Sequence, residues 1–150
     1  MLLSKNRKAF HDYEILEKFL AGIVLQGYEV KAIREGNVNL TGAFVTIIGG
    51  KVQVTNMHIG KYSKQSQKYD EATSRKSRPL LLSQSEIFKL TREVSEKGKT
   101  AVPLALLLKH NKVKVEIGVV RGRKKFEKKA VAKERQIKKD MAIERKEMGL

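Results

Sequence analysis

The sequence predicts an α+β protein built on a small antiparallel β-barrel, with short flanking helices and a basic C-terminal tail. Five or six apolar segments have strand length, and two segments have helical spacing with capping residues. The last 30 residues have a smaller share of apolar side chains and contain 12 basic against 5 acidic residues. A chain of 150 residues, 41% of them hydrophobic, is long enough to form a substantial hydrophobic core. We therefore expect a barrel domain at residues 1–122 and a tail at residues 123–150.

Two hairpins are the clearest strand signals. Residues 112–119 alternate apolar and polar side chains, and residues 101–108 before them are apolar. The short link between them includes His110 and Asn111, and Asn suits the positive φ of a tight turn. Residues 43–48 and 51–56 form a second expected hairpin around Gly49-Gly50, and residues 13–25 read as an earlier extended stretch.

Two helices are expected, at residues 28–34 and 84–96. Gly36 and Gly98 follow them at positions typical of helix C-caps. The second helix begins with Ser83 and has Glu86 three residues later, which is the spacing of a capping box. Residues 60–78 are mostly polar or basic and are expected to form a long loop.

The charge balance indicates a polyanionic partner. The chain has 32 Lys and Arg against 16 Asp and Glu, a net charge of +16. Nucleic acid is the leading partner class, and an anionic membrane surface is the rival. We expect a cytoplasmic protein with no membrane partner, because the sequence has neither an apolar run of 18 residues nor a leader-like start. Nothing in the sequence indicates an obligate dimer, so we expect a monomer.

Catalytic and metal chemistry are not indicated. The chain has no Cys, which removes disulfides and thiolate chemistry, and its three His lack metal-ligand spacing. Gly98-Lys99-Thr100 resembles part of a phosphate-binding loop, but it follows a helix and precedes a strand, so a helix C-cap is the better interpretation. We expect no enzyme activity and no cofactor.

Basic residues around the last strand form a candidate RNA surface. Lys112 and Lys114 lie on the polar strand face, and the chain then continues into a cationic run that contains one ring, Phe126, available for base stacking. The run consists of Arg121, Arg123, Lys124, Lys125, Lys128 and Lys129. A second strip is expected in the loop: Lys61, Lys64, Lys68, Arg75, Lys76 and Arg78.

Two other segments leave alternatives open. His11-Asp12-Tyr13, after a basic stretch, suits RNA contacts, but it equally suits a ragged N-terminus entering a strand. The tail has no Pro and no Gly between Gly122 and Gly149, so its residues favour a helix, while its few apolar residues predict that the helix needs a partner. A general RNA-binding ribosomal or ribosome-assembly protein fits these features too.

A set of short motifs, in order along nearly the whole chain, resembles the small protein B family. These are the bacterial SsrA-binding proteins that partner transfer-messenger RNA in trans-translation. The motifs are Asn6-Arg7-Lys8-Ala9, His11-Asp12-Tyr13, Ala21-Gly22-Ile23, Gly27-Tyr28-Glu29-Val30-Lys31, Arg34-Glu35-Gly36, Asn56-Met57-His58-Ile59, Arg78 to Leu82, Lys114 to Gly118, and Gly122-Arg123-Lys124-Lys125.

The resemblance implies an oligonucleotide-binding-like barrel and a tail that is disordered when free and helical on the ribosome. It implies that the barrel binds the tRNA-like domain of transfer-messenger RNA and brings it to the empty A site of a stalled ribosome. The tail would occupy the decoding centre and the mRNA channel, against 16S rRNA, so that the RNA's own reading frame tags the nascent peptide.

The resemblance also implies a set of site residues. RNA contacts are expected from Asn6, Lys8, His11, Tyr13, Leu81, Lys114, Gly122, Arg123, Lys124 and Lys125, and ribosome contacts from Phe126, Glu127, Lys128 and Lys129. One position departs from the family, which usually has an RNA-linked Glu where this chain has Leu20. Glu17 could supply that acid only if the RNA docked differently. Residues 73–76 also replace the usual Asp-Pro-Thr-Arg with Thr-Ser-Arg-Lys.

Overall fold

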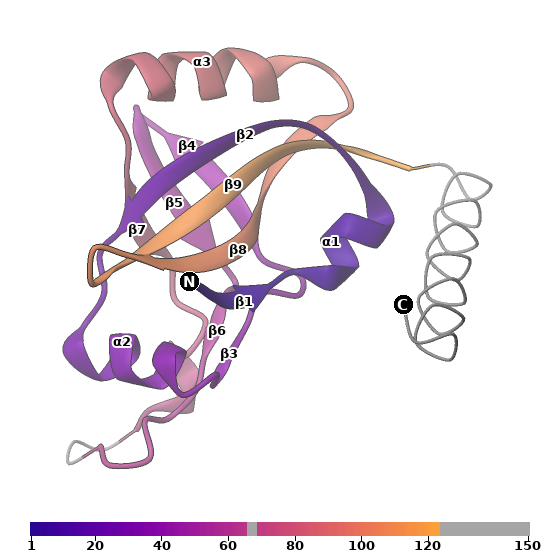
Figure 1. Ribbon diagram of the computed structural model, residues 1–150. Helices are drawn as coiled ribbons and strands as arrows, with labels where there is room; N and C mark the ends of the chain where they lie inside the picture. The colour runs from indigo at the N-terminus through magenta and orange to yellow at the C-terminus, as the bar shows by residue number, and fades with distance from the viewer. Residues whose placement is uncertain (66–68, 124–150) are drawn as a thin grey trace, which may run out of the picture.

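A computed structural model describes residues 1–65 and 69–123 of the protein (Figure 1). A curled antiparallel sheet dominates it, and α3 and α2 lie at opposite ends of the sheet (Figure 1). The elements are β1 Leu2–Lys5, α1 Arg7–Asp12, β2 Tyr13–Ile23, α2 Gly27–Arg34, β3 Val38–Asn39, β4 Phe44–Ile48, β5 Lys51–Thr55, β6 His58–Ile59, the 3₁₀ turn η1 Glu71–Thr73, β7 Arg78–Leu81, α3 Gln84–Ser95, β8 Lys99–Lys109 and β9 Lys112–Gly122.

The sheet is an open barrel. Seven strands follow the order β1-β8-β9-β2-β7-β5-β4, and β3 pairs separately with β6. β4 lies next to β8, but within the described ranges no ladder joins them. β4 does not pair with the outer edge of β8 because other backbone groups bond to that edge. The Asn6 N–H donates to the Leu104 carbonyl at 2.8 Å, and β1 pairs with the next residues of β8. The α+β prediction is confirmed, and the barrel is left open between β4 and β8.

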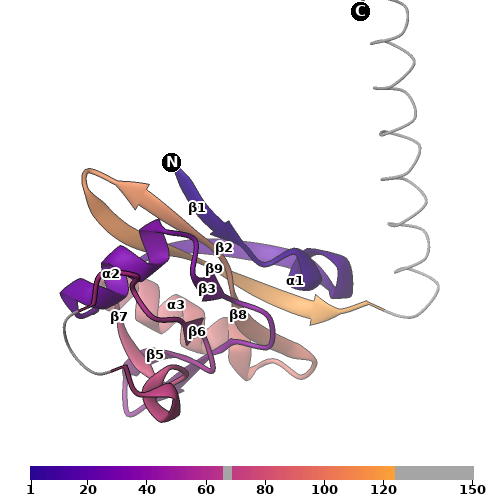
Figure 2. The same ribbon diagram turned by 90° about the horizontal axis from the view of Figure 1, so that it is seen from below.

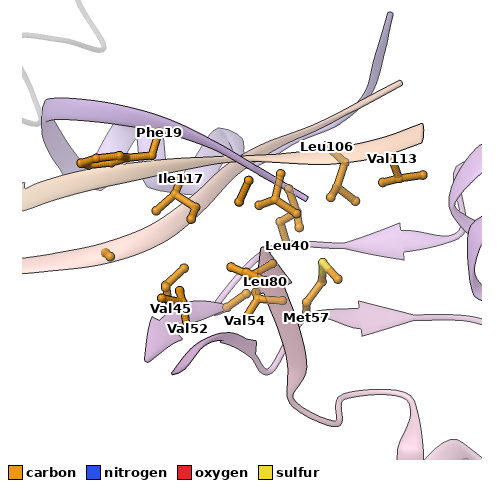
Figure 3. Close-up of a cluster of buried hydrophobic side chains, with 14 of the residues drawn as sticks. Phe19, Leu40, Val45, Val52, Val54, Met57, Leu80, Leu106, Val113 and Ile117 are labelled. Carbon is orange, nitrogen blue, oxygen red and sulfur yellow. The ribbon is translucent and has the colours of Figure 1, made fainter. Parts of the chain in front are cut away.

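The core lies between two layers of the curled sheet (Figure 3). The predicted alternation of β9 is confirmed, since Val113, Val115, Ile117 and Val119 are all buried. From the other layer, β4, β5 and β7 contribute side chains such as Val45, Val54 and Leu80 (Figure 3). Burial of these side chains away from water is the main force that holds the layers together.

The apolar run of β8 is explained by a second, smaller cluster on the outer face of the sheet. Ala9 of α1 packs there with Val102, Leu104 and Val120. Every residue from 101 to 106 is therefore buried, because the core covers one face of β8 and α1 covers the other. Leu104 sits at a register shift between Pro103 and Ala105 and packs over Gly118, where an added Cβ would lie 2.6 Å from the Leu104 Cδ1 atom.

The turns and most of the helix caps agree with the sequence predictions. Both hairpins form, with positive φ at Asn111 and at Gly49 and Gly50. Helix α3 has the capping box that was expected for it, in which the Glu86 N–H donates to the Ser83 hydroxyl at 3.3 Å. Gly36 follows the C-cap of α2 with φ 84°, as predicted. Gly98 is not the C-cap of α3, because α3 already ends at Glu96; with φ 86° it lies in the turn closed by the Lys99 N–H and the Glu96 carbonyl at 3.2 Å.

The N-terminus and the expected loop contain more structure than the sequence predicted. β1 and α1 precede β2, and the loop expected at residues 60–78 is interrupted by η1 and runs into β7. The expected tail from residue 124 onward, with its helix and its aromatic and basic ribosome-contact residues, lies outside the described residues. None of the helices in the described part of the chain is long and apolar enough to cross a membrane.

Candidate RNA interface

Asn6 is the N-cap of the short helix α1, at one edge of the candidate interface. Its side-chain oxygen accepts from the Ala9 N–H at 3.2 Å, and its Nδ2 donates to the carbonyls of Pro103 at 2.9 Å and Leu40 at 3.3 Å. Only 4% of Asn6 is exposed. Its side chain is therefore committed to the protein, and Asn6 positions α1 instead of offering its own polar atoms to RNA. The Asn preference for helix N-caps is the sequence signal for this role.

The other predicted residues of this region meet where α1, β2 and β9 join. Tyr13 pairs with Gly122 across the two strands. The Arg123 N–H donates to the Asp12 carbonyl at 2.8 Å, and the Arg123 Nε donates to the Tyr13 carbonyl at 3.0 Å. Figures 1 and 2 both show α1 beside this end of β2 and β9. The end of the barrel is thus tied to α1 through Arg123.

Exposed cationic and ring groups surround this junction. Lys8 is exposed, and the His11 side chain is 42% exposed with its Nδ1 3.0 Å from the Asp12 Oδ1. The Lys5 Nζ lies 4.6 Å from the centre of the Phe10 ring. We call Lys8, His11, Tyr13, Gly122 and Arg123 the α1 group. Its members come from two separate segments, residues 8–13 and 122–123, so the N-terminus enters β2 through an ordered helix and is not a ragged end.

Leu81 and Lys114 form a second group at the other end of the same strands. Gly22 pairs with Lys114 on one side and with Leu81 on the other. A Cβ at Gly22 would lie 3.3 Å from the Leu81 Cβ and 3.7 Å from the Lys114 Nζ, so the absence of a side chain there lets both approach. Leu81 is 60% exposed, and a cleft of about 300 Å³ opens beside it. We call Leu81 and Lys114 the distal group.

The two groups lie on one face of the sheet but do not form one site. The rows Tyr13–Gly122 and Gly22–Lys114 are nine residues apart along β2, which is about 30 Å for an extended strand. A register shift between Ile15 and Glu17 keeps both ends of β2 on the outer face.

The expected continuous basic strip along β9 is not formed by the described residues. Beyond Lys114 the outer face carries Glu116, whose carboxylate lies 3.6 Å from the Lys18 Nζ, and then Gly118 and Val120 beneath Leu104 and α1. Arg121 forms an ion pair with Glu14. Positive charge is therefore concentrated at the two ends. Lys124 and Lys125 of the same prediction lie outside the described residues.

Arg78 does not belong to the second expected strip of basic residues, the one in the loop. Arg78 is only 2% exposed, and its Nε donates to the Glu29 Oε2 at 2.7 Å. Its other nitrogens donate to the carbonyls of Met57, Lys76 and Ser74. Arg78 was wrongly expected to be a surface cation, because a guanidinium can be buried when a carboxylate and carbonyls satisfy all its donors. The remaining described members, Lys61, Lys64, Arg75 and Lys76, are exposed.

Glu17 does not take the place of the acid that the family usually has at the position of Leu20. Leu20 is 38% exposed on the outer face, opposite Glu116. The Glu17 Oε1 lies 2.5 Å from the Lys89 Nζ of α3. Glu17 therefore faces α3, whereas the carboxylate next to position 20 belongs to Glu116.

A 310 Å³ cleft beside α1 adds residues that the sequence did not single out. It is lined by residues of α1, β2, β4 and β8, among them Lys8, Tyr13, Phe44 and Thr100. Strand alternation could have indicated Phe44, since Ala43 and Val45 on either side of it are buried. The approach of β4 to α1 depends on the tertiary fold and has no local sequence signal.

An open antiparallel barrel with cationic side chains near both ends of one face is compatible with an oligonucleotide-binding-like protein. A family model described as SmpB protein matches residues 3–147, so the chain belongs to the SmpB family. It is 45% identical over 145 residues to the SsrA-binding protein of Staphylococcus aureus (strain JH1), covering 96% of this chain and 92% of that one. The SsrA-binding protein of Sulfurihydrogenibium sp. (strain YO3AOP1) is 46% identical over 140 residues, covering 93% and 91%.

A solved structure supports the same relationship. It is reported under the name "tmRNA-SmpB: a journey to the center of the bacterial ribosome" and is 40% identical to this chain, with a TM-score of 0.69. The match covers 83% of this chain and 87% of that chain. The family implied by the sequence motifs is confirmed.

Proposed function

We propose that the protein binds the tRNA-like domain of transfer-messenger RNA and delivers it to the empty A site of stalled ribosomes, which enables trans-translation and peptide tagging. The observation that carries this proposal is the likeness to the tmRNA-SmpB structure over 83% of the chain at 40% identity. The net charge of +16 supports an RNA partner. Its place of work is the cytoplasm, where ribosomes and this RNA meet.

The separation of the α1 group and the distal group indicates what kind of RNA surface would bind both. The α1 group and the distal group are about 30 Å apart measured along β2. Because the paired strands β2 and β9 hold the two groups at this separation, only an RNA whose surface reaches both ends satisfies both groups. This is recognition of folded RNA by shape, with phosphate contacts at Lys8, Arg123 and Lys114.

The C-terminal tail has a separate role in the proposal. It becomes helical on the ribosome and enters the decoding centre and mRNA channel, with Phe126 stacking on rRNA bases and Glu127, Lys128 and Lys129 beside it. Support comes from composition, since residues 121–150 contain 12 basic and 5 acidic residues and few apolar ones. Circular dichroism of a peptide of residues 124–150 tests this: it should be mostly unfolded in dilute buffer, and a fully helical spectrum would contradict folding on binding.

Competition binding tests the RNA preference. The labelled tRNA-like domain is bound to the full chain and challenged with duplex RNA of equal length at rising salt. Phosphate contacts that ignore sequence and shape weaken steeply with salt, so the preference for the tRNA-like domain should persist while duplex binding is lost. Equal loss of both would favour the general RNA-binding alternative.

A further inference from the structure

The 310 Å³ cleft beside α1 has one exposed aromatic wall. Phe44 is the first residue of β4 and is 42% exposed, whereas its neighbours Ala43 and Val45 point into the core. β4 ends the strand order of the sheet, so its outer edge carries no ladder among the described residues. Tyr13, half-buried on β2, lines the same cleft. Two rings thus face a space that no described side chain fills.

Polar groups complete the lining of the cleft. Lys8 is exposed, and no ion pair links it to any other residue in the described ranges. Thr100 brings a hydroxyl group to the wall, and Asp12, whose Oδ1 lies 3.0 Å from the His11 Nδ1, also lines the cleft. The cleft also adjoins Arg123, whose N–H is bonded to the Asp12 carbonyl. An aromatic surface with polar edges and a free cation is the combination that binds a nucleotide: the ring stacks, the polar groups meet the base edge and the cation meets the phosphate.

The size of the cleft and the charge around it indicate which kind of molecule binds there. A volume of about 310 Å³ is at the small end of ligand pockets, which span roughly 300–1,000 Å³. That space is large enough for one planar base. The cleft continues the cationic α1 group, which favours a polyanion over a neutral ligand.

We infer that this cleft is a subsite for one unstacked RNA base, which stacks on Phe44 while its phosphate lies at Lys8. The inference rests on the proposed function for the RNA itself but assigns a contact that lies outside the set expected from the sequence. The base can come from the tRNA-like domain or from rRNA of the small ribosomal subunit, and the test separates these two sources.

The chain contains no Trp, so one substitution creates a specific reporter. Phe44→Trp places a single indole at the cleft, and its fluorescence is titrated with the tRNA-like domain and, separately, with small ribosomal subunits. A base stacked on the indole quenches it. Quenching in one arm identifies the source of the base. Absence of quenching in both arms, with wild-type affinity retained, overturns the inference.

Affinity measurements with matched variants give an independent readout. Phe44→Ala should weaken binding of the RNA that quenches by roughly 5- to 150-fold, the loss of one stacked base, and Phe44→Tyr should retain the affinity. The control is Phe88→Ala, because Phe88 is 69% exposed on α3 and does not line the cleft. Equal affinities for Phe44→Ala and wild type would contradict the inference.

The two proposals fail in different ways. If wild-type protein shows no preference for the tRNA-like domain over duplex, the proposed function fails, while quenching by RNA together with the Phe44→Ala loss still supports the subsite. If the preference is present but the Phe44 variants behave like wild type, the subsite fails and the proposed function stands.

Discussion

Replacing Asn6 by Ala separates a positioning role from an RNA contact. The substitution removes the α1 N-cap and leaves the carbonyls of Leu40 and Pro103 without their side-chain donor. The lost cap costs about 1 kcal/mol, and each buried carbonyl adds roughly 1 kcal/mol. We therefore expect the free energy of unfolding to fall by about 3 kcal/mol, which lowers Tm by about 10 °C for a domain of this size.

Urea unfolding followed by far-UV circular dichroism measures this loss. Ser83→Ala is the matched control, since Ser83 also caps a helix but is exposed, and it should cost only about 1 kcal/mol. RNA affinity of the folded Asn6→Ala variant is measured in the same buffer without urea. The positioning argument is refuted if Asn6→Ala is no less stable than Ser83→Ala and yet binds RNA more weakly, because that pattern belongs to a direct contact.

Two further substitutions test the fold that carries the interface. Arg78→Met should lower the free energy of unfolding by about 3–5 kcal/mol in urea, because the buried Glu29 carboxylate keeps only Lys76, whose Nζ lies 3.9 Å from the Glu29 Oε1. A loss under about 1 kcal/mol would show that Arg78 is not an anchor. Gly118→Ala should cost about 1–3 kcal/mol by thermal unfolding, since the new Cβ overlaps Leu104. Its control, Gly27→Ala, has open space around the Cβ and should leave stability unchanged or raise it by up to about 1 kcal/mol; equal effects of the two would contradict the packing argument.

The elements that the sequence predicted are those with local signals. Alternation located β9, the pair of glycines located the turn between β4 and β5, and Ser83 with Glu86 located the start of α3. In each case side-chain pattern and backbone geometry depend on residues a few positions apart. The antiparallel α+β class followed from these signals.

The missed elements depend on contacts between distant segments. β1 is stable because it adds to the edge of β8, and six-residue α1 is too short to persist without Asn6 and the apolar patch beneath it. β7 contains Pro79, which cannot donate to a ladder. The structure accommodates it by splitting the pairing, so that Arg78 and Pro79 pair with β5 while Leu80 and Leu81 pair with β2.

The candidate site was predicted as a set of residues but not as an arrangement. Motif resemblance supplied Lys8, His11 and Arg123, and the fold brings them together. The motifs could not indicate that Asn6 is buried, because its burial depends on the packing of β8 over it. They also could not indicate that Leu81, which pairs with Gly22 of β2, lies about 30 Å along β2 from Tyr13. Charge alone also misplaced Arg78, since a sequence does not show which cations are paired inside.

The most direct test of the central claim is a peptide-tagging assay on ribosomes stalled at the end of an mRNA. It compares the full chain, Phe126→Ala and a chain ending after Arg123, which keeps the hydrogen bonds of Arg123 to Asp12 and Tyr13. We predict tagging with the full chain, reduced tagging with Phe126→Ala, and no tagging with the truncated chain even though it still binds the tRNA-like domain. Full tagging by the truncated chain would contradict the role of the tail, and no tagging by the full chain would contradict the proposed function itself.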